Sequence, residues 1–437
     1  MFKRLTEART DVLRRTDVKW VRGETADPMG PVFLKDGVYH RAVREHKADF
    51  ARRLFNEGIV DELTDIGFLN RQRIGKIQVE GAAFTIESDA ADFPIVTNFY
   101  PFELVRRAAL KWLDAELLLE KHGLCLIDGH FANFGIFGNA SPRSFDLGSV
   151  VETPPPPNFR YGVNEFLRFF FYPLVSVYRH PELASIIRSR ALSQDQGLNV
   201  QEGEYLTNFK LTPYGTDRDR VLRALREALA GLEFSWNRTT WSHYNEERID
   251  RVSRKSMESA TADSRAGSIL SLLRRVLKPN DVVLDLAGND GFFGLHAAAA
   301  GYRTIIHDGD ETALYRGLER VDREPSWKVA FVSGDAMSNM QTADVVLALA
   351  ITHHLYITDH RYFNAIAERF SSYTKSTLIT EFMPWGLSME GPPKNLSKDY
   401  TLENFVKHLK VHFSDVQVVS QNVAEAGHPR VLLLCKK

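Results

Sequence analysis

The stretch Val282-Val283-Leu284-Asp285-Leu286-Ala287-Gly288-Asn289-Asp290-Gly291 decides the fold of the second half of this chain. Its apolar first half is typical of a buried strand, and its small residues are typical of a tight turn. A helical pattern over 292–300 follows at once. A strand, a glycine turn and a helix N-terminus in this order predict a nucleotide-binding corner.

Further strand patterns follow the turn, with helical patterns between them, and this alternation predicts a parallel sheet with crossover helices. The expected strands lie at 304–308, 331–336, 344–350 and 377–382. A helix over 401–412 and two closely connected strands, 416–420 and 430–435, end the chain. Because a short connection joins antiparallel strands, we expect an α/β, Rossmann-like sheet of seven strands with a C-terminal antiparallel hairpin.

Acidic residues end the second and third expected strands. Asp308 falls about 20 residues after the glycine turn, where a dinucleotide fold places the carboxylate that binds ribose. Asp335 follows the third strand. With these acids, the element order over roughly residues 265–437 resembles the class I S-adenosylmethionine-dependent methyltransferase family.

The resemblance implies S-adenosylmethionine as the cofactor and a set of residues around it. In the family's first motif, Asp-x-Gly-x-Gly-x-Gly, Asp285 and Gly291 stand in place. Ala287 and Asn289 replace the first two glycines, and Asn tolerates a positive φ better than most residues. Asp308 matches the carboxylate that binds the ribose hydroxyls, and Asp335 matches the acid that faces the adenine amino group. The expected cofactor-binding residues are Asp285, Ala287, Gly288, Asn289, Gly291, Asp308, Asp335, Ala336 and Tyr244.

Tyr244 belongs to an aromatic segment, with Trp236 and Trp241, that precedes the first strand. In this family such residues often lie over the cofactor, and aromatic rings attract a methyl-sulfonium cation. A hydrophobic seam between domains is the alternative interpretation.

Methyl transfer from a sulfonium mainly requires a nucleophile that is held close and in line. The sequence shows no metal-ligand cluster, so we expect no metal. If the acceptor is a hydroxyl, His is the usual general base, and His353 or His354 follows the fourth strand. Both could instead be structural. Glu381 ends the fifth strand at the edge where ligands bind, and it could hold a polar group of the substrate, or serve in packing or capping.

The front half carries a second motif. Asp128, Asn133 and the Asp-x-Gly at Asp146 have the spacing of a kinase catalytic loop and its metal-binding turn. With the helical pattern over 102–122 before it, this region partly resembles aminoglycoside-phosphotransferase-type kinases.

Several features depart from the kinase pattern. Leu126 stands where a histidine is usual, and no phosphate-cradling glycine loop precedes it. Where a lysine should contact the phosphates, the strand over 37–43 carries Arg41, which is no simple replacement for lysine, or nothing at all. The segment 49–69 could supply the paired helix, with Glu57 or Glu62 as its acid. A degenerate, kinase-like α+β domain that transfers no phosphate is therefore the favoured interpretation.

A broader resemblance joins the two halves. Four stretches are similar to large bacterial methyltransferases related to nodulation-associated methyltransferases, namely 38–69, 100–104, 128–148 and 400–405. This resemblance implies that the front half is a standing part of the enzyme, and it suggests saccharide chemistry only by analogy at the level of the fold.

Composition limits the class of protein. With 437 residues, 44% hydrophobic content and a net charge of −1, the chain has room for two or three domains and no footprint for nucleic acid or membrane surfaces. The run 166–178 is too short to span a bilayer, and the N-terminus lacks a signal-peptide core. Cys125 and Cys435 indicate reduced, buried residues of a cytoplasmic protein.

We expect a kinase-like domain at 1–153, a helical and aromatic linker at 154–263 that begins with four prolines, and a methyltransferase domain at 264–437. The leading hypothesis is a methyltransferase acting at O or N of a small molecule or saccharide. The alternatives are a bifunctional methyltransferase and kinase, and a binding protein with a relic methyltransferase core. The sequence does not indicate the oligomeric state.

Overall fold

The computed structural model describes residues 12–21, 27–93, 99–153, 162–191, 197–210, 217–233, 249–262, 264–338, 342–388, 390–421 and 428–437. The chain forms two compact units. The first consists of Met1–Asn98, Leu104–Ile136 and Pro142–Ser235, and the second of Phe99–Glu103, Phe137–Ser141 and Trp236–Lys437. The finer division into parts at 1–153, 154–263 and 264–437 stays a prediction.

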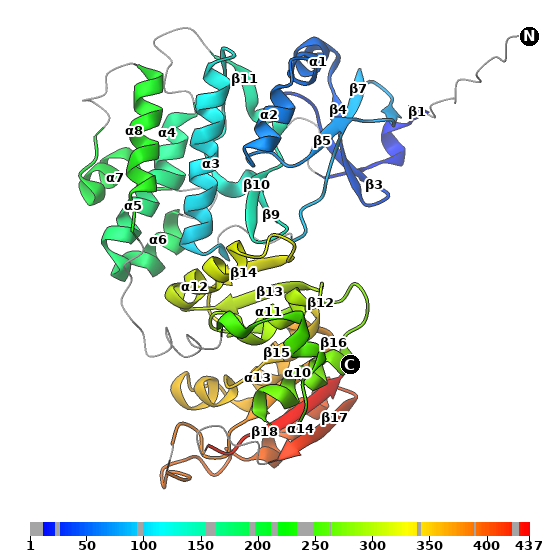
Figure 1. Ribbon diagram of the computed structural model, residues 1–437, viewed down its shortest axis with the longest axis vertical. Coiled ribbons are helices and arrows are strands. Elements are labelled where there is room, and N and C mark those ends of the chain that lie inside the picture. The colour runs from blue at the N-terminus through cyan, green and yellow to red at the C-terminus, as the bar shows by residue number, and fades with distance from the viewer. Residues whose placement is uncertain are drawn as a thin grey trace, which may run out of the picture. The chain divides into compact units, whose positions relative to one another are not determined.

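The second unit is built on a seven-stranded sheet, as the sequence predicts (Figure 1). Its strands are β12 (Val282–Leu286), β13 (Arg303–Asp308), β14 (Val329–Ser333), β15 (Ala343–Ala348), β16 (Thr374–Phe382), β17 (Asp415–Gln421) and β18 (Val431–Lys436). They lie in the order β14-β13-β12-β15-β16-β18-β17. The first five are parallel, and β18 runs antiparallel to both β16 and β17. The expected C-terminal hairpin is therefore confirmed.

Helices cover this sheet because its strands are apolar on both faces. They are α9 (Arg254–Glu258), α10 (Arg265–Val276), α11 (Phe292–Ala299), α12 (Glu311–Asp322), α13 (Phe363–Tyr373) and α14 (Leu402–His412). Side chains of α9, α10 and α11 form one core with alternate residues of β12, β15, β16 and β18, including Val283, Leu347 and Ile379. Phe405 of α14 stacks with Phe382, and Phe363 of α13 meets the same ring edge-on.

The strand order reverses beside β12, because the chain first adds β13 and β14 on one side and then β15 on the other. In open α/β sheets, ligands bind outside the carboxyl ends of the strands at such a switch point. The turn after β12 and the segment after β15 are therefore the places to look for a site.

The first unit has an antiparallel sheet of five strands in the order β2-β3-β4-β7-β5. Its strands are β2 (Lys19–Trp20), β3 (Val32–Lys35), β4 (Val38–Val43), β5 (Gln72–Ile74) and β7 (Phe84–Ser88). Short pairs are made by β1 (Val12–Leu13) with β6 (Gln78–Val79), β8 (Leu124–Leu126) with β11 (Val150–Glu152), and β9 (Phe134–Phe137) with β10 (Ser141–Ser144). The architecture is α+β, as expected, and its likeness to kinases stays a prediction.

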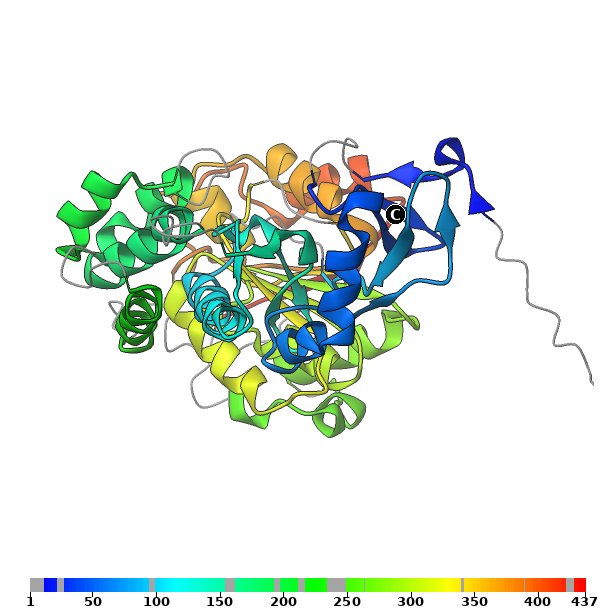
Figure 2. The ribbon, with the colours of Figure 1, turned by 90° about the horizontal axis from the view of Figure 1, so that it is seen from above.

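The helices of the first unit are α1 (Ala48–Asn56), α2 (Ile59–Asp65), α3 (Phe102–Glu120), α4 (Val163–Phe166), α5 (Tyr172–Arg179), α6 (Ala184–Ala191), α7 (Val200–Thr207) and α8 (Arg218–Ala230). Figure 2 views α3, the long cyan helix, nearly end-on. Trp112 of α3 stacks on Phe166, with ring centroids 4.5 Å apart. Its indole N–H donates to the carbonyl of Asp128 at 2.8 Å, so α3 holds the predicted catalytic loop.

Other expectations concern single residues and segments. Cys125 and Cys435 are buried and unpaired, as predicted. Among the residues that the structure describes, no helix is both long and apolar enough to cross a membrane. The four prolines of 154–157 lie outside the described residues.

Candidate functional site

The turn after β12 has the backbone that the glycine motif requires, although two of its glycines are replaced. Ala287, Asn289 and Gly291 all have positive φ, at 53°, 58° and 90°. A left-handed conformation costs an L-residue such as Ala287 roughly 1–2 kcal/mol. Gly288 is needed for a different reason, because a Cβ there would lie 2.5 Å from the carboxyl carbon of Asp285. The turn therefore keeps its shape at some cost in strain.

Asp285 lies beneath this turn and organises it. Its side chain is buried, and one carboxylate oxygen accepts from the backbone N–H of Gly294 at 2.8 Å, in the first turn of α11. Burial raises the pKa of Asp285 to about 7, and the nearby Asp308 and Asp290 carboxylates act in the same direction. Asp285 thus ties the strand to the helix and is poorly placed to contact solvent.

Asp308, at the end of β13, joins the turn to the second strand. Its carboxylate accepts from the backbone N–H of Asn289 at 2.7 Å and from that of Asp310 at 2.8 Å. The backbone N–H of Gly288 donates to the carbonyl of His307 at 2.9 Å, which fixes the same junction. Burial raises the pKa of Asp308 to about 6. The structure therefore brings together the turn and the acid that sequence analysis assigned to one ligand.

Asp335 and Ala336 follow β14, the strand next to β13. Asp335 is exposed, and its carboxylate accepts from the backbone N–H of Met337 at 2.7 Å. Ala336 is buried, and its carbonyl accepts from the hydroxyl of Tyr373 at 2.9 Å. Their predicted roles in adenine binding stay predictions.

His353 and His354 follow β15 on the other side of the switch point. Their rings lie 4.1 Å apart, between centroids. Burial above all, and then the nearby His354, Arg430 and His428, lower the pKa of His353 to about 2. Burial also lowers the pKa of His354, whose side chain is only partly buried, whereas Asp359 raises it. Both rings are thus held neutral, and His354 is the stronger base of the two.

Glu381 is buried in an ion pair that sequence analysis missed. Its two oxygens accept from Nε and Nη2 of Arg265, each at 2.8 Å, and Nη1 of Arg430 lies 3.5 Å from one of them. Arg265 also lies over the ring of Phe293. Because both oxygens face guanidinium groups, this environment fits the packing alternative for Glu381 better than contact with a substrate.

Four further polar side chains gather at the carboxyl ends of β15 and β16. Thr352 Oγ1, His353 Nδ1, His428 Nε2 and Arg430 Nε are buried and have no hydrogen-bond partner. No local sequence pattern pointed to His428 and Arg430, because it is the antiparallel pairing of β18 with β16 that brings them to this edge. Tyr244, with Trp236 and Trp241, lies outside the described residues, so its predicted role stays a prediction.

The kinase-like motif of the first unit also comes together in space. The side-chain amide of Asn133 donates to the carboxylates of Asp128 and Asp146, each at 3.3 Å. Burial, and then the charge of Asp146, raise the pKa of Asp128. Arg41 Nη2 donates to Asp146 at 2.7 Å, and Arg41 also forms an ion pair with Asp27. Asp146, the acid of the expected metal-binding turn, is thus paired with an arginine of the sheet.

The expected acid partners of Arg41 are not the observed ones. Glu57 pairs with Arg53 on its own helix, and Glu62 lies 3.3 Å from the ring of His122. Each is engaged by a near neighbour, so the suggestion that 49–69 supplies the acid paired with Arg41 is wrong.

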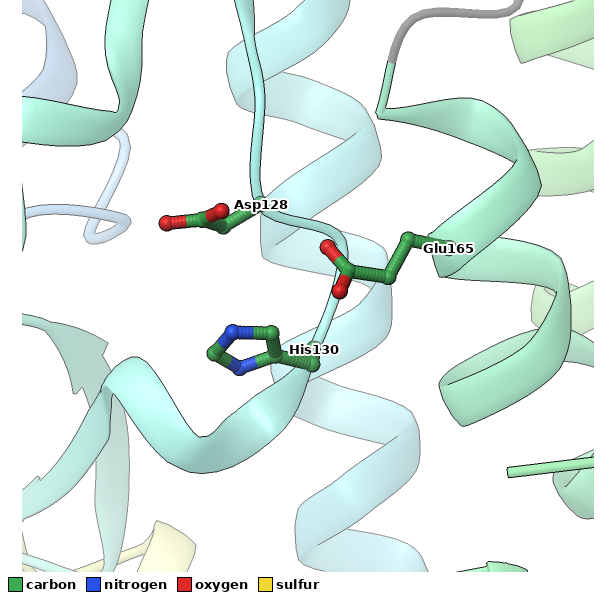
Figure 3. A group of neighbouring side chains, drawn as sticks. All are labelled: Asp128, His130 and Glu165. Carbon is green, nitrogen blue, oxygen red and sulfur yellow. The ribbon is translucent and has the colours of Figure 1, made fainter. Parts of the chain in front are cut away.

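Three possible metal ligands converge beside the same loop. Asp128, His130 and Glu165 each offer one ligand atom, and these atoms all lie within 4.8 Å of one another (Figure 3). Glu165 also accepts from the backbone N–H of Gly129 at 2.7 Å. The sequence could not reveal this set, because Glu165 comes from α4, beyond the proline run.

Comparisons with known proteins add the following. No protein-family model matches the chain, and no curated protein matches it. Similar solved structures are S-adenosylmethionine-dependent methyltransferases. Magnesium protoporphyrin IX methyltransferase from Synechocystis PCC 6803, crystallised with S-adenosylmethionine, is 14% identical over 47% of this chain and 87% of its own, with a TM-score of 0.33. A TehB-like S-adenosylmethionine-dependent methyltransferase from Corynebacterium glutamicum is 10% identical over 45% of this chain and 98% of its own, with a TM-score of 0.30.

WbdD, described as a bifunctional kinase-methyltransferase, is 15% identical over 44% of this chain and 39% of its own, with a TM-score of 0.30. Likenesses this low carry no functional argument. The function therefore has to be inferred from the residues of this chain.

Proposed function

We propose that the second unit is a class I S-adenosylmethionine-dependent methyltransferase that transfers the methyl group to an oxygen or nitrogen of a small molecule or saccharide. One observation carries the proposal. The carboxylate of Asp308 accepts from the backbone of the left-handed turn at Asn289, 2.7 Å away, at the switch point of a seven-stranded sheet. In the proposed role, Asp308 would accept from the ribose hydroxyls, next to the backbone that would lie against the amino-acid end of the donor.

The assigned roles follow from the geometry. The turn at Ala287, Gly288 and Gly291 would let the cofactor approach the backbone closely, and Asp285 would hold this turn to α11. Asp308 would bind ribose, while Asp335 and Ala336 would lie beside the adenine. Methyl transfer needs alignment above all, and these groups supply it for the donor.

His354 is our candidate for the general base, if the acceptor has a proton to lose. Its imidazole is neutral and partly exposed, whereas the pKa of His353, at about 2, makes that ring a very weak base. We propose His353 as a neighbour that shapes the site and Glu381 as a structural residue of the same edge.

Binding of S-adenosylhomocysteine, the product of methyl transfer, tests the proposal directly. We expect saturable one-to-one binding to the whole chain by isothermal titration calorimetry, and loss of most of that affinity in Asp308→Asn. The control is Asp281→Asn, which removes a carboxylate at the amino end of β12 that also accepts one backbone hydrogen bond, from Lys278. Absence of binding by S-adenosylmethionine and by its product would overturn the proposal.

A second candidate function is favoured by the convergence of Asp128, Asn133 and Asp146 in the first unit. These groups correspond to the base and metal ligands of the kinase pattern, so the unit could bind a nucleotide. We expect the Arg41 pair with Asp146 to oppose this, because it already occupies one metal ligand.

Titration with Mg·ATP distinguishes the two possibilities. If the wild-type chain does not bind Mg·ATP, methyl transfer remains as the single proposed function. Binding that Asp146→Ala abolishes, while the exposed-site control Asp61→Ala retains it, would establish the bifunctional alternative.

A further inference from the structure

The proposed cofactor site does not explain the polar cluster of Thr352, His353, His428 and Arg430. Their side chains are 0%, 5%, 3% and 6% exposed, yet each has a polar atom without a hydrogen-bond partner. A buried polar group that makes no hydrogen bond costs about 1–3 kcal/mol. Four such groups in one place are too costly to be incidental, so they are expected to have a partner that is not part of the chain.

The place of the cluster points to a ligand of the methyltransferase site. Thr352 and His353 follow β15, one of the two strands at the switch point. His428 and Arg430 immediately precede β18, whose first residue, Val431, pairs with Phe382 at the carboxyl end of β16. All four groups therefore lie along the edge at which ligands of open α/β sheets bind. Arg430 and His428 are both among the groups that lower the pKa of His353, which agrees with close approach of the three.

The chemistry of the cluster selects an anion. Arginine offers only donors, and a threonine hydroxyl and a neutral imidazole can each offer one. Arg430 shares the carboxylate of Glu381 with Arg265, and its Nε has no hydrogen-bond partner. Among the described residues whose charges act on His353 there is no carboxylate. A buried guanidinium with such an N–H is stabilised by a bound negative charge.

We propose that Thr352, His353, His428 and Arg430 bind a compact oxyanion, a carboxylate or a phosphate, carried by the methyl acceptor. The site would place that anion beside His354 and fix the acceptor for in-line attack on the methyl group. Trp385, whose ring lies 5.9 Å from that of His428, would border the site. The assignment to an acceptor rests on the proposed function, whereas the anion site itself does not.

Nuclear magnetic resonance of the whole chain, labelled with 15N-histidine and saturated with S-adenosylhomocysteine, tests the site. Sodium phosphate and sodium acetate are the two probes, with sodium chloride holding the ionic strength constant. Substitutions His353→Gln and His428→Gln assign the two imidazole signals. We expect both signals to shift in a saturable way with at least one probe, while the exposed His46 of the first unit does not respond. A response to phosphate alone or to acetate alone identifies the anion class.

Two variants test whether the cluster itself binds the anion. Arg430→Gln should lower the affinity for the anion roughly tenfold to hundredfold, the loss expected for one charged hydrogen-bond donor. Because Arg430 also contacts Glu381, the Arg430→Gln variant can fail to fold. In that case Thr352→Val is measured instead, and it should lower the affinity for the anion severalfold.

The outcomes separate the two proposals. The chain can bind S-adenosylhomocysteine and yet show no saturable shift of the two histidine signals with either probe. The polar groups of the cluster are then hydrogen-bonded by water alone, and the proposed anion site is overturned. Anion binding without any S-adenosylhomocysteine binding would support the site and overturn the methyltransferase proposal.

Discussion

Replacing Asp308 by asparagine is predicted to weaken binding of the proposed cofactor while changing the stability of the fold little. The side chain keeps its size but loses its charge. The pKa of Asp308 is about 6 instead of the ordinary 3.8, because burial disfavours the charged form. A rise of about two pH units corresponds to roughly 3 kcal/mol that the ionised carboxylate costs the folded protein above pH 6. Asparagine removes this cost.

Asparagine also weakens the contacts of the carboxylate with two backbone N–H groups, those of Asn289 and Asp310. Only one amide oxygen is left to accept, so one N–H loses its partner at about 1–3 kcal/mol. The two effects nearly cancel, and the free energy of unfolding near pH 8 should change by less than about 2 kcal/mol. The affinity for S-adenosylhomocysteine should fall by about 1–3 kcal/mol, or roughly 5-fold to 150-fold, because the ribose hydroxyls lose a charged acceptor.

The pH dependence supplies an independent check. The folded pKa of Asp308 lies above the unfolded one, so this group makes the folded state more stable as the pH falls from about 6 toward 4. Ribose binding favours the ionised form, so affinity should rise with pH up to about 6 and then level off. Calorimetry and urea unfolding at pH 5, 6 and 8 measure both quantities. Unchanged affinity in Asp308→Asn, with the same pH profile as wild type, would refute the assignment of Asp308 to the ribose.

Other predictions concern the turn, the buried ion pair and the histidines. Ala287→Gly should keep the affinity for S-adenosylhomocysteine and raise the melting temperature, because glycine adopts the left-handed conformation without strain. Gly288→Ala should lower that affinity at least tenfold, because the added Cβ would clash with the Asp285 carboxyl group. Arg265→Ala should lower the free energy of unfolding by about 3–5 kcal/mol in urea titrations, since it removes the two shorter hydrogen bonds of the buried Glu381 carboxylate and leaves it the contact with Arg430 at 3.5 Å. The exposed pair broken in Arg254→Ala should leave stability unchanged. The pKa of His353 is lowered to about 2, so between pH 6.5 and 5.5 the unfolded chain takes up a proton at this residue and the folded chain does not. Between pH 7.5 and 5.5 the free energy of unfolding of the wild type should therefore fall by about 1 kcal/mol more than that of His353→Gln. Equal losses of stability would contradict the burial of that ring.

The seven-stranded sheet was accessible from sequence because its signals are local. β12, β14 and β15 are apolar runs that end on, or are followed by, small residues, and β13 ends on Asp308. Boundaries differ by a few residues, as at β16, which begins at Thr374 instead of 377. Asp285 and Asp308 were identified for the same reason, since the end of a parallel strand fixes which edge a residue occupies.

The environment of the candidate site was not accessible in this way. Glu381 was a candidate substrate ligand because it ends a strand, yet Arg265, more than 100 positions earlier, holds both of its oxygens. Glu165 joins Asp128 and His130 through a helix that follows the proline run. Such pairings join segments far apart in the chain, and no local pattern encodes which charges meet.

The sequence by itself determined the order of strands and helices, the terminal hairpin and the acids that end β12 and β13, because spacing along a chain with a fixed strand period dictates these features. Only the tertiary structure decided which of these side chains are available. It neutralised Asp146 with Arg41, placed Glu381 between two arginines and brought His428 and Arg430 beside His353. Burial and nearby charges control the reactivity of these side chains, and both depend on contacts that exist only once the sheet has formed.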